Sequence, residues 1–307
     1  MPLTSRVEAF QGLRILAAFG IVVFHSNATE VTRYIGGAGV VVFLFLTAYL
    51  SSVSTSGSDF SRVAGDRASR VLGPWLFWTA FYFGIVLLRA TRGNYSFFES
   101  LGPWTLLRGT WYHLWYLPYA FVVSLTIIYL KPKLSRIKPT LIIAICTLLS
   151  VGIWALRRSI QLDYNMPSEA SMWVAGFALV PNAYGAVIAT KLATTTARQF
   201  ALSTLFLVPI GFNLALFAFD PYSDVISIVL GLILARVAIS INVPKMKVVD
   251  WLSSLCLGVY LVHPFVMLCL EQVPVTLPIW GQIWIVFVSS VALTAALRSI
   301  RLIKRFV

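Results

Sequence analysis

Long apolar runs separated by short polar segments dominate the pattern along this chain. A run of roughly 18 or more apolar residues can cross a bilayer as a helix, and a soluble fold lacks the polar surface to cover many such runs. The pattern predicts an all-α fold, a polytopic bundle of about ten transmembrane helices. The predicted spans lie near residues 12–31, 37–54, 72–90, 113–130, 139–156, 170–189, 200–219, 223–240, 251–270 and 280–298.

The segments between these runs are short, and no linker, clear repeat or low-complexity stretch divides the chain. We therefore expect one membrane-embedded domain that covers residues 1–307. The weakest predicted span is 170–189, because Pro181 and Asn182 interrupt its apolar run.

Composition and charge support a membrane protein and predict its orientation. The chain is 59% hydrophobic and 11% charged, whereas soluble domains contain about 25% charged residues. If the N-terminus is cytoplasmic and the spans alternate, 18 of the 24 Lys and Arg residues fall in cytoplasmic segments. This positive-inside bias predicts that both termini are cytoplasmic. The same bias accounts for most of the formal charge of +13, and it places basic residues near anionic lipid headgroups. No soluble basic face is left to present, so we expect no nucleic-acid partner.

The first predicted span carries two ionisable residues, Arg14 and His25. Their separation of eleven positions is almost three helical turns, so both lie on one face, about 16 Å apart along the axis. With Arg14 at the cytoplasmic surface, His25 is expected near the middle of the hydrocarbon core, where an ionisable residue indicates function. Two structural interpretations stay open: Arg14 as a snorkelling residue and His25 as an interhelical hydrogen-bonding residue.

A second basic pair, Arg67 and Arg70, precedes the third predicted span at a spacing that places both on one helical face. The planar guanidinium group binds phosphate oxygens through two hydrogen bonds. The alternative is that this Arg-rich segment, which includes Arg62, only fixes topology.

The two other histidines also fall at or inside predicted spans. His113 begins the segment His113-Leu114-Trp115-Tyr116-Leu117, and His263 lies in Tyr260-Leu261-Val262-His263-Pro264. Each is either a site residue or a packing histidine with one hydrogen bond. The aromatic-rich segment 104–119 is either an interfacial belt or a stacking surface for a sugar ring.

Five short motifs occur in order along the chain. They are Gly12-Leu13-Arg14-Ile15-Leu16-Ala17-Ala18 followed by His25; Gly36-Gly37-Ala38-Gly39-Val40-Val41-Val42-Phe43-Leu44-Phe45-Leu46-Thr47; Arg67 and Arg70 followed by Pro74; His113-Leu114-Trp115-Tyr116-Leu117; and Tyr260-Leu261-Val262-His263-Pro264. The ordered set resembles the acyltransferase-3 family of membrane O-acyltransferases, whose members O-acetylate bacterial exopolysaccharides, O-antigens and related glycans.

Two positions depart from the motifs of that family. Val41 stands where many members have Asp, which removes one partner for a catalytic histidine, and Thr47-Ala48 replaces the usual Ser-Gly.

The resemblance implies a multi-pass acyltransferase of the bacterial inner (plasma) membrane. Such an enzyme moves an acetyl or other short acyl group from acyl-CoA to a hydroxyl of an exopolysaccharide or other surface glycan precursor, for example a lipid-linked oligosaccharide. Acetyl-CoA would then be a co-substrate rather than a permanently bound cofactor. No metal site is expected.

The same resemblance assigns roles to the candidate residues. His25 is the expected catalytic residue, either as a general base or as an acyl-histidine nucleophile. Arg14, Arg67 and Arg70 are expected to bind the CoA phosphates. Residues expected to shape the site or contact substrate are His113, Trp115, Tyr116, Tyr260 and His263. Two rival functions are a transporter or flippase for a lipid-linked sugar, which would often show internal repeats, and a non-catalytic scaffold.

Overall fold

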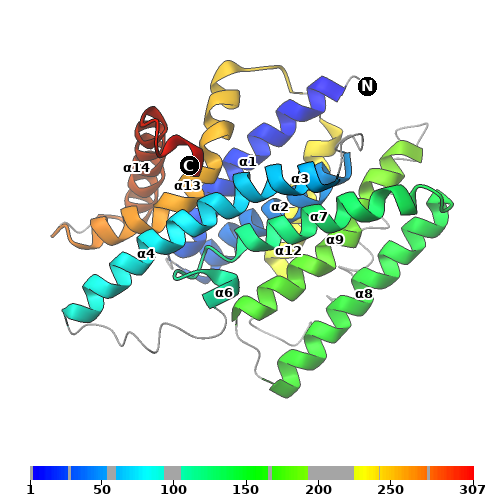
Figure 1. Cartoon of the computed structure of the whole chain (residues 1–307), viewed down its shortest axis with the longest axis horizontal. Helices are drawn as coiled ribbons and strands as arrows, with labels where there is room; N and C mark the ends of the chain where they lie inside the picture. Colours follow the sequence, from blue (N-terminus) through cyan, green and yellow to red (C-terminus); the bar gives the residue numbers. More distant parts are fainter. Residues whose placement is uncertain are drawn as a thin grey trace.

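The computed structural model describes residues 3–26, 29–53, 60–92, 105–164, 168–192, 225–241, 243–274 and 277–307. Within these ranges the chain is mostly helical and has no strand, as the sequence predicts (Figure 1). The α-helices are α1 (Leu3–His25), α2 (Glu30–Val53), α3 (Phe60–Arg67), α4 (Gly73–Thr91), α6 (Thr105–Arg108), α7 (Tyr116–Leu134), α8 (Pro139–Tyr164), α9 (Ser168–Leu192), α12 (Val225–Ser240), α13 (Lys247–Glu271) and α14 (Ile279–Ser299).

Every predicted span except 200–219, which lies outside the described residues, overlaps one of these helices. Within the described ranges, 7 helical segments are long and apolar enough to cross a membrane. They are Glu8–His25, Glu30–Val53, Phe60–Thr91, Tyr116–Leu134, Pro139–Leu156, Lys247–Glu271 and Ile279–Ser299. A shorter apolar helix covers Ile226–Ile239. The total of ten spans and the cytoplasmic termini stay predictions.

The first span ends earlier than predicted. The 12–31 boundary is wrong because α1 stops at His25, and the apolar segment is Glu8–His25. Polar side chains produce the break: the Thr29 hydroxyl accepts a hydrogen bond from the Thr32 backbone N–H (3.1 Å), which caps the start of α2. His25 is therefore the last residue of its helix rather than the middle of a span.

Two further helices are more continuous than the sequence suggested. The third span begins at Phe60, because a π-helical segment, Ala68–Leu72, joins α3 to α4 without interrupting the helix. Pro181 does not break α9, which runs through it from Ser168 to Leu192.

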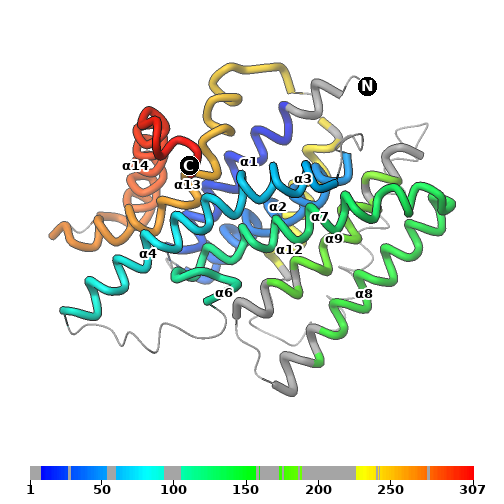
Figure 2. Tube along the Cα trace, viewed as in Figure 1, coloured from blue at the N-terminus to red at the C-terminus, as the bar shows by residue number. Residues whose placement is uncertain are grey.

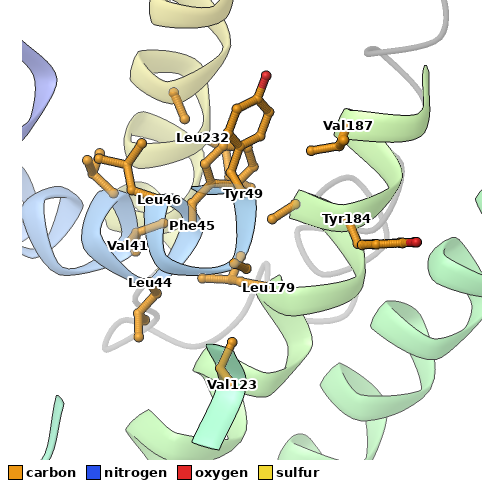
Figure 3. Close-up of a cluster of buried hydrophobic side chains, with 14 of the residues drawn as sticks. Val41, Leu44, Phe45, Leu46, Tyr49, Val123, Leu179, Tyr184, Val187 and Leu232 are labelled. Atoms are coloured by element: carbon orange, nitrogen blue, oxygen red, sulfur yellow. The ribbon is translucent and has the colours of Figure 1, made fainter. Parts of the chain in front are cut away.

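The helices pack around α1 and α2, which lie near the centre of the bundle (Figures 1 and 2). α4 and α7 cross in front of them, α8 and α9 pair at one side, and α13 and α14 pair at the other (Figure 2). A large apolar core joins α2, α7, α9 and α12, together with residues of α1 and α8 (Figure 3). Phe45, Leu179 and Leu232 belong to this core.

α1 and α2 approach so closely that glycine is required between them. A Cβ atom added to Gly36 would lie 2.6 Å from the Gly20 carbonyl oxygen and would also collide with the backbone of Phe24. Small residues allow such backbone contact between membrane helices, where packing rather than water drives association. The glycine-rich sequence at the start of α2 therefore sets the position of α1.

We predict that Gly36→Ala destabilises the protein by about 1–3 kcal/mol, the usual effect of overpacking a tight contact. The measurement is thermal unfolding of the purified protein in detergent. Gly84→Ala on α4 is the matched control, since its new Cβ would meet no atom within 4 Å. Equal unfolding temperatures for the two variants would contradict the proposed contact.

Candidate active site

Two cavities lie on either side of a thin wall of side chains. The first, called here the basic cavity, has a volume of about 550 Å³ and is lined by Arg14, Arg67, Arg70 and Arg298 among others. The second, the histidine cavity, has a volume of about 300 Å³ and is lined by His25, His113 and Tyr112 among others.

The arginines of the basic cavity come from three separate parts of the chain: α1, the continuous helix Phe60–Thr91, and α14. Arg14 lies on α1, Arg67 ends α3, Arg70 lies in the π-helical segment and Arg298 lies in the last turn of α14. The structure thus brings together the three arginines predicted as phosphate ligands. Among the described residues, no carboxylate pairs with any of these three. Unpaired guanidinium groups around one cavity favour an anionic ligand with several oxygens.

Arg298 is one of the 18 Lys and Arg residues assigned to cytoplasmic segments, and the sequence predicted no other role for it. Its guanidinium group donates hydrogen bonds to the Ser254 hydroxyl (2.9 Å) and the Ser254 carbonyl oxygen (2.6 Å) on α13. These bonds fix it at the edge of the basic cavity. Its position near the end of a span gave no signal, because positive-inside topology places arginines there in any membrane protein.

His25 and His263 form one hydrogen-bonded chain. His25 Nδ1 lies 3.0 Å from His263 Nε2, and His263 Nδ1 lies 2.8 Å from the Tyr260 carbonyl oxygen. A carbonyl only accepts, so the proton of a neutral His263 is on Nδ1 and its Nε2 accepts from His25. We assign the Nδ1–H tautomer to His25 on this basis. Its Nε2 then keeps a free lone pair at a residue that lines the histidine cavity.

His113 is fully buried among aromatic rings. Its ring packs edge-on against Tyr82 and Tyr260, with centroids 5.3 and 5.2 Å away, and lies 5.4 Å from the His263 ring. The backbone of Leu261 lies near the His113 ring. His113 lines the histidine cavity, and both interpretations, a site residue and a packing histidine, stay open.

Three side chains line both cavities and form the wall between them: Phe43, Tyr116 and Tyr260. We call these three residues the aromatic wall. Ring centroids are 5.8 Å apart for Phe43 and Tyr116 and 5.6 Å apart for Tyr116 and Tyr260. The Tyr116 hydroxyl is held by the Thr47 hydroxyl at 2.6 Å. The sequence gave no signal for Phe43, since one more Phe in an apolar helix is unremarkable.

The last part of the aromatic-rich segment 104–119, from His113 on, faces inward. Trp115 is buried, lines the histidine cavity and packs against Tyr119, which is fully buried. The belt interpretation is wrong for these residues, because lipid does not reach them. Tyr112 is 42% exposed beside the cavity. Trp104 lies outside the described residues.

The two residues that depart from the second family motif, Val41 and Thr47, have different surroundings in the structure. Val41 packs in the apolar core against Gly231 of α12, while His263 is the partner of His25. Thr47 keeps a hydroxyl at its position and uses it to hold Tyr116.

The three histidine rings lie close together, with the ring centroids of His25 and His113 at 5.1 and 5.4 Å from that of His263. Over the described ranges of the chain, no group of three His, Cys, Asp or Glu side chains has an arrangement that could hold a metal ion. The hydrogen-bonded pair instead offers one unprotonated imidazole nitrogen, which suits proton abstraction or nucleophilic attack.

Comparison with known protein families identifies a family to which the chain is similar. The model of the acyltransferase domain that defines the acyltransferase-3 family matches residues 7–298, nearly the whole chain. No curated protein and no solved structure matches. The matched range contains both cavities and the aromatic wall.

We predict that His25 and His263 are both neutral Nδ1–H tautomers at neutral pH. With His labelled by ¹⁵N, the protein has only 3 labelled side chains, which single His→Asn variants assign. Each of the two residues should show a protonated Nδ1 and an unprotonated Nε2 in NMR spectra. A protonated Nε2 on His263 would contradict the assigned chain of hydrogen bonds.

Proposed function

The chain belongs to the acyltransferase-3 family of membrane acyltransferases, and from this premise we propose its donor, acceptor and mechanism. The protein moves an acetyl or other short acyl group from acyl-CoA to a hydroxyl of an exopolysaccharide or other surface glycan precursor in the bacterial inner membrane. One observation carries this proposal: a cavity with unpaired arginines and a cavity with an oriented imidazole share a single wall.

The basic cavity is the proposed binding site for CoA. Its diphosphate and 3′-phosphate present several anionic oxygens, which match the forks of Arg14, Arg67 and Arg70. Arg298 adds a fourth cation. In the predicted orientation this cavity faces the cytoplasm, where acyl-CoA is made. The narrow pantetheine arm would then extend toward the aromatic wall.

His25 is the proposed catalytic residue. Its Nε2 removes the proton of the acceptor hydroxyl, while His263 holds the ring through Nδ1 and stabilises the charge that develops. A buried, neutral imidazole is the form that this task requires. Attack by Nε2 on the thioester to form an acyl-histidine uses the same tautomer, so both routes stay open.

The histidine cavity is the proposed acceptor site. Trp115 and Tyr112 offer aromatic faces on which the apolar face of a sugar ring can stack. A volume of about 300 Å³ suits one sugar unit and a short acyl group rather than a long acyl chain. The transporter alternative receives no support from the family match.

We predict that His25→Ala abolishes acyl transfer while the protein still inserts and binds CoA. Loss of a general base lowers the rate about 10²–10⁴-fold. The assay is mass spectrometry of surface glycans from a deletion strain that carries the wild-type protein or the variant, with turnover normalised to folded protein. Near-wild-type acyl content with His25→Ala would refute the catalytic role.

We predict that Arg67→Ala and Arg70→Ala each weaken CoA binding about ten-fold or more, because a hydrogen bond to a charged group contributes roughly 1.5–3 kcal/mol. Arg62→Ala is the matched control: Arg62 is exposed on the same helical segment and lines neither cavity. Calorimetric titration of the purified variants with CoA gives the affinities. If all three variants bind equally, these arginines serve topology alone.

A further inference from the structure

We propose that the Tyr260 hydroxyl donates a hydrogen bond to the carbonyl oxygen of the acyl thioester and stabilises the oxyanion that forms there. The inference rests on the proposed function and adds a residue to it. Tyr260 entered the sequence analysis only as a residue that shapes the site.

The Tyr260 hydroxyl is a hydrogen-bond donor without an acceptor. Tyr260 is 6% exposed, and among the described residues no acceptor takes the proton of its buried hydroxyl. A buried polar group without a partner is unfavourable, by about 1–3 kcal/mol. Such a group in a site that binds substrate is free to bind an atom that arrives with the substrate.

The position of Tyr260 fits the thioester carbonyl. Tyr260 lines both cavities. A thioester that enters from the basic cavity and a hydroxyl activated by His25 in the histidine cavity can meet only at their common boundary. The other tyrosine of the aromatic wall, Tyr116, already uses its hydroxyl in the bond to Thr47. Tyr260 is therefore the wall residue with a free donor.

The helix next to Tyr260 adds to the same effect. The Tyr260 ring packs on Tyr116, which is the first residue of α7, and no side chain caps that helix. The N-terminus of a helix carries a partial positive charge and stabilises nearby anions. The oxyanion would thus form between a phenol donor and a helix N-terminus.

The step balances as follows. His25 Nε2 takes the proton of the acceptor hydroxyl, whose oxygen bonds to the thioester carbon. The carbonyl electron pair moves onto oxygen, where the Tyr260 hydroxyl stabilises it. Collapse of this intermediate re-forms the carbonyl and breaks the C–S bond, and the CoA thiolate takes the proton from His25. If an acyl-histidine forms first, the same carbonyl oxygen carries the charge.

The first test compares Tyr260→Phe with Tyr119→Phe. The Tyr119 hydroxyl is also buried and without a partner, but Tyr119 lines neither cavity. Removal of one oxyanion donor lowers kcat about 10²–10³-fold. We expect a loss of at least about 100-fold for Tyr260→Phe, with KM for acyl-CoA nearly unchanged, and activity close to wild type for Tyr119→Phe. Equal activities for the two variants would overturn the proposal.

The second test separates a hydrogen bond from a structural role. Two CoA ligands are compared: a carba analogue of acetyl-CoA, which keeps the carbonyl but replaces the sulfur with CH₂, and S-ethyl-CoA, which lacks the carbonyl. The wild-type protein should bind the carba analogue more tightly, and Tyr260→Phe should lose this preference. A preference that survives in the variant would refute the role of Tyr260. Failure of the wild-type protein to bind either ligand would instead refute the proposed function.

Discussion

Two helix backbones can touch only where neither carries a bulky side chain, and the contact between α1 and α2 depends on this constraint. Gly20 on one helix faces Gly36 on the other, and a single added methyl group would collide with backbone atoms. This contact fixes α1, which ends at His25, relative to α2, which carries Phe43 and Thr47. The position of the imidazole relative to the aromatic wall therefore depends on these two glycines, which lie about one and a half turns from His25 and about two turns from Phe43.

Hydrogen bonds between α1 and α13 and between α2 and α7 then position the other side chains of the site. α13 packs against α1 and places His263 where its ring joins His25 to the Tyr260 carbonyl. Thr47 of α2 holds the Tyr116 hydroxyl at the start of α7. Each contact joins a residue near the N-terminus to one from the second or last third of the chain. The site is thus assembled from distant segments, and only the folded bundle contains it.

The sequence predicts much of the fold and the parts of the site that depend on local periodicity. Apolar runs locate the helices, because the bilayer demands a minimum length. The eleven-residue spacing places Arg14 and His25 on one face, and each lines a cavity bounded by Phe43. The end of α1 was misplaced because the prediction ran on through the polar residues that follow His25, where Thr29 caps the start of α2. The pairing of His25 with His263 and the role of Arg298 depend on contacts between distant helices, which periodicity does not contain.

The aromatic wall also has an electrical consequence. Moving one charge across a membrane potential of 100 mV involves about 2.3 kcal/mol of electrical work. Where two cavities open to opposite sides of a membrane, most of the potential drops across the protein layer that separates them. In the predicted orientation that layer is Phe43, Tyr116 and Tyr260. In the proposed step the acyl group leaves CoA and a proton returns to the CoA sulfur, so no net charge crosses this layer, and the phosphates of CoA stay on the cytoplasmic side. The protein would then pass a chemical group through an energised membrane without net electrical work.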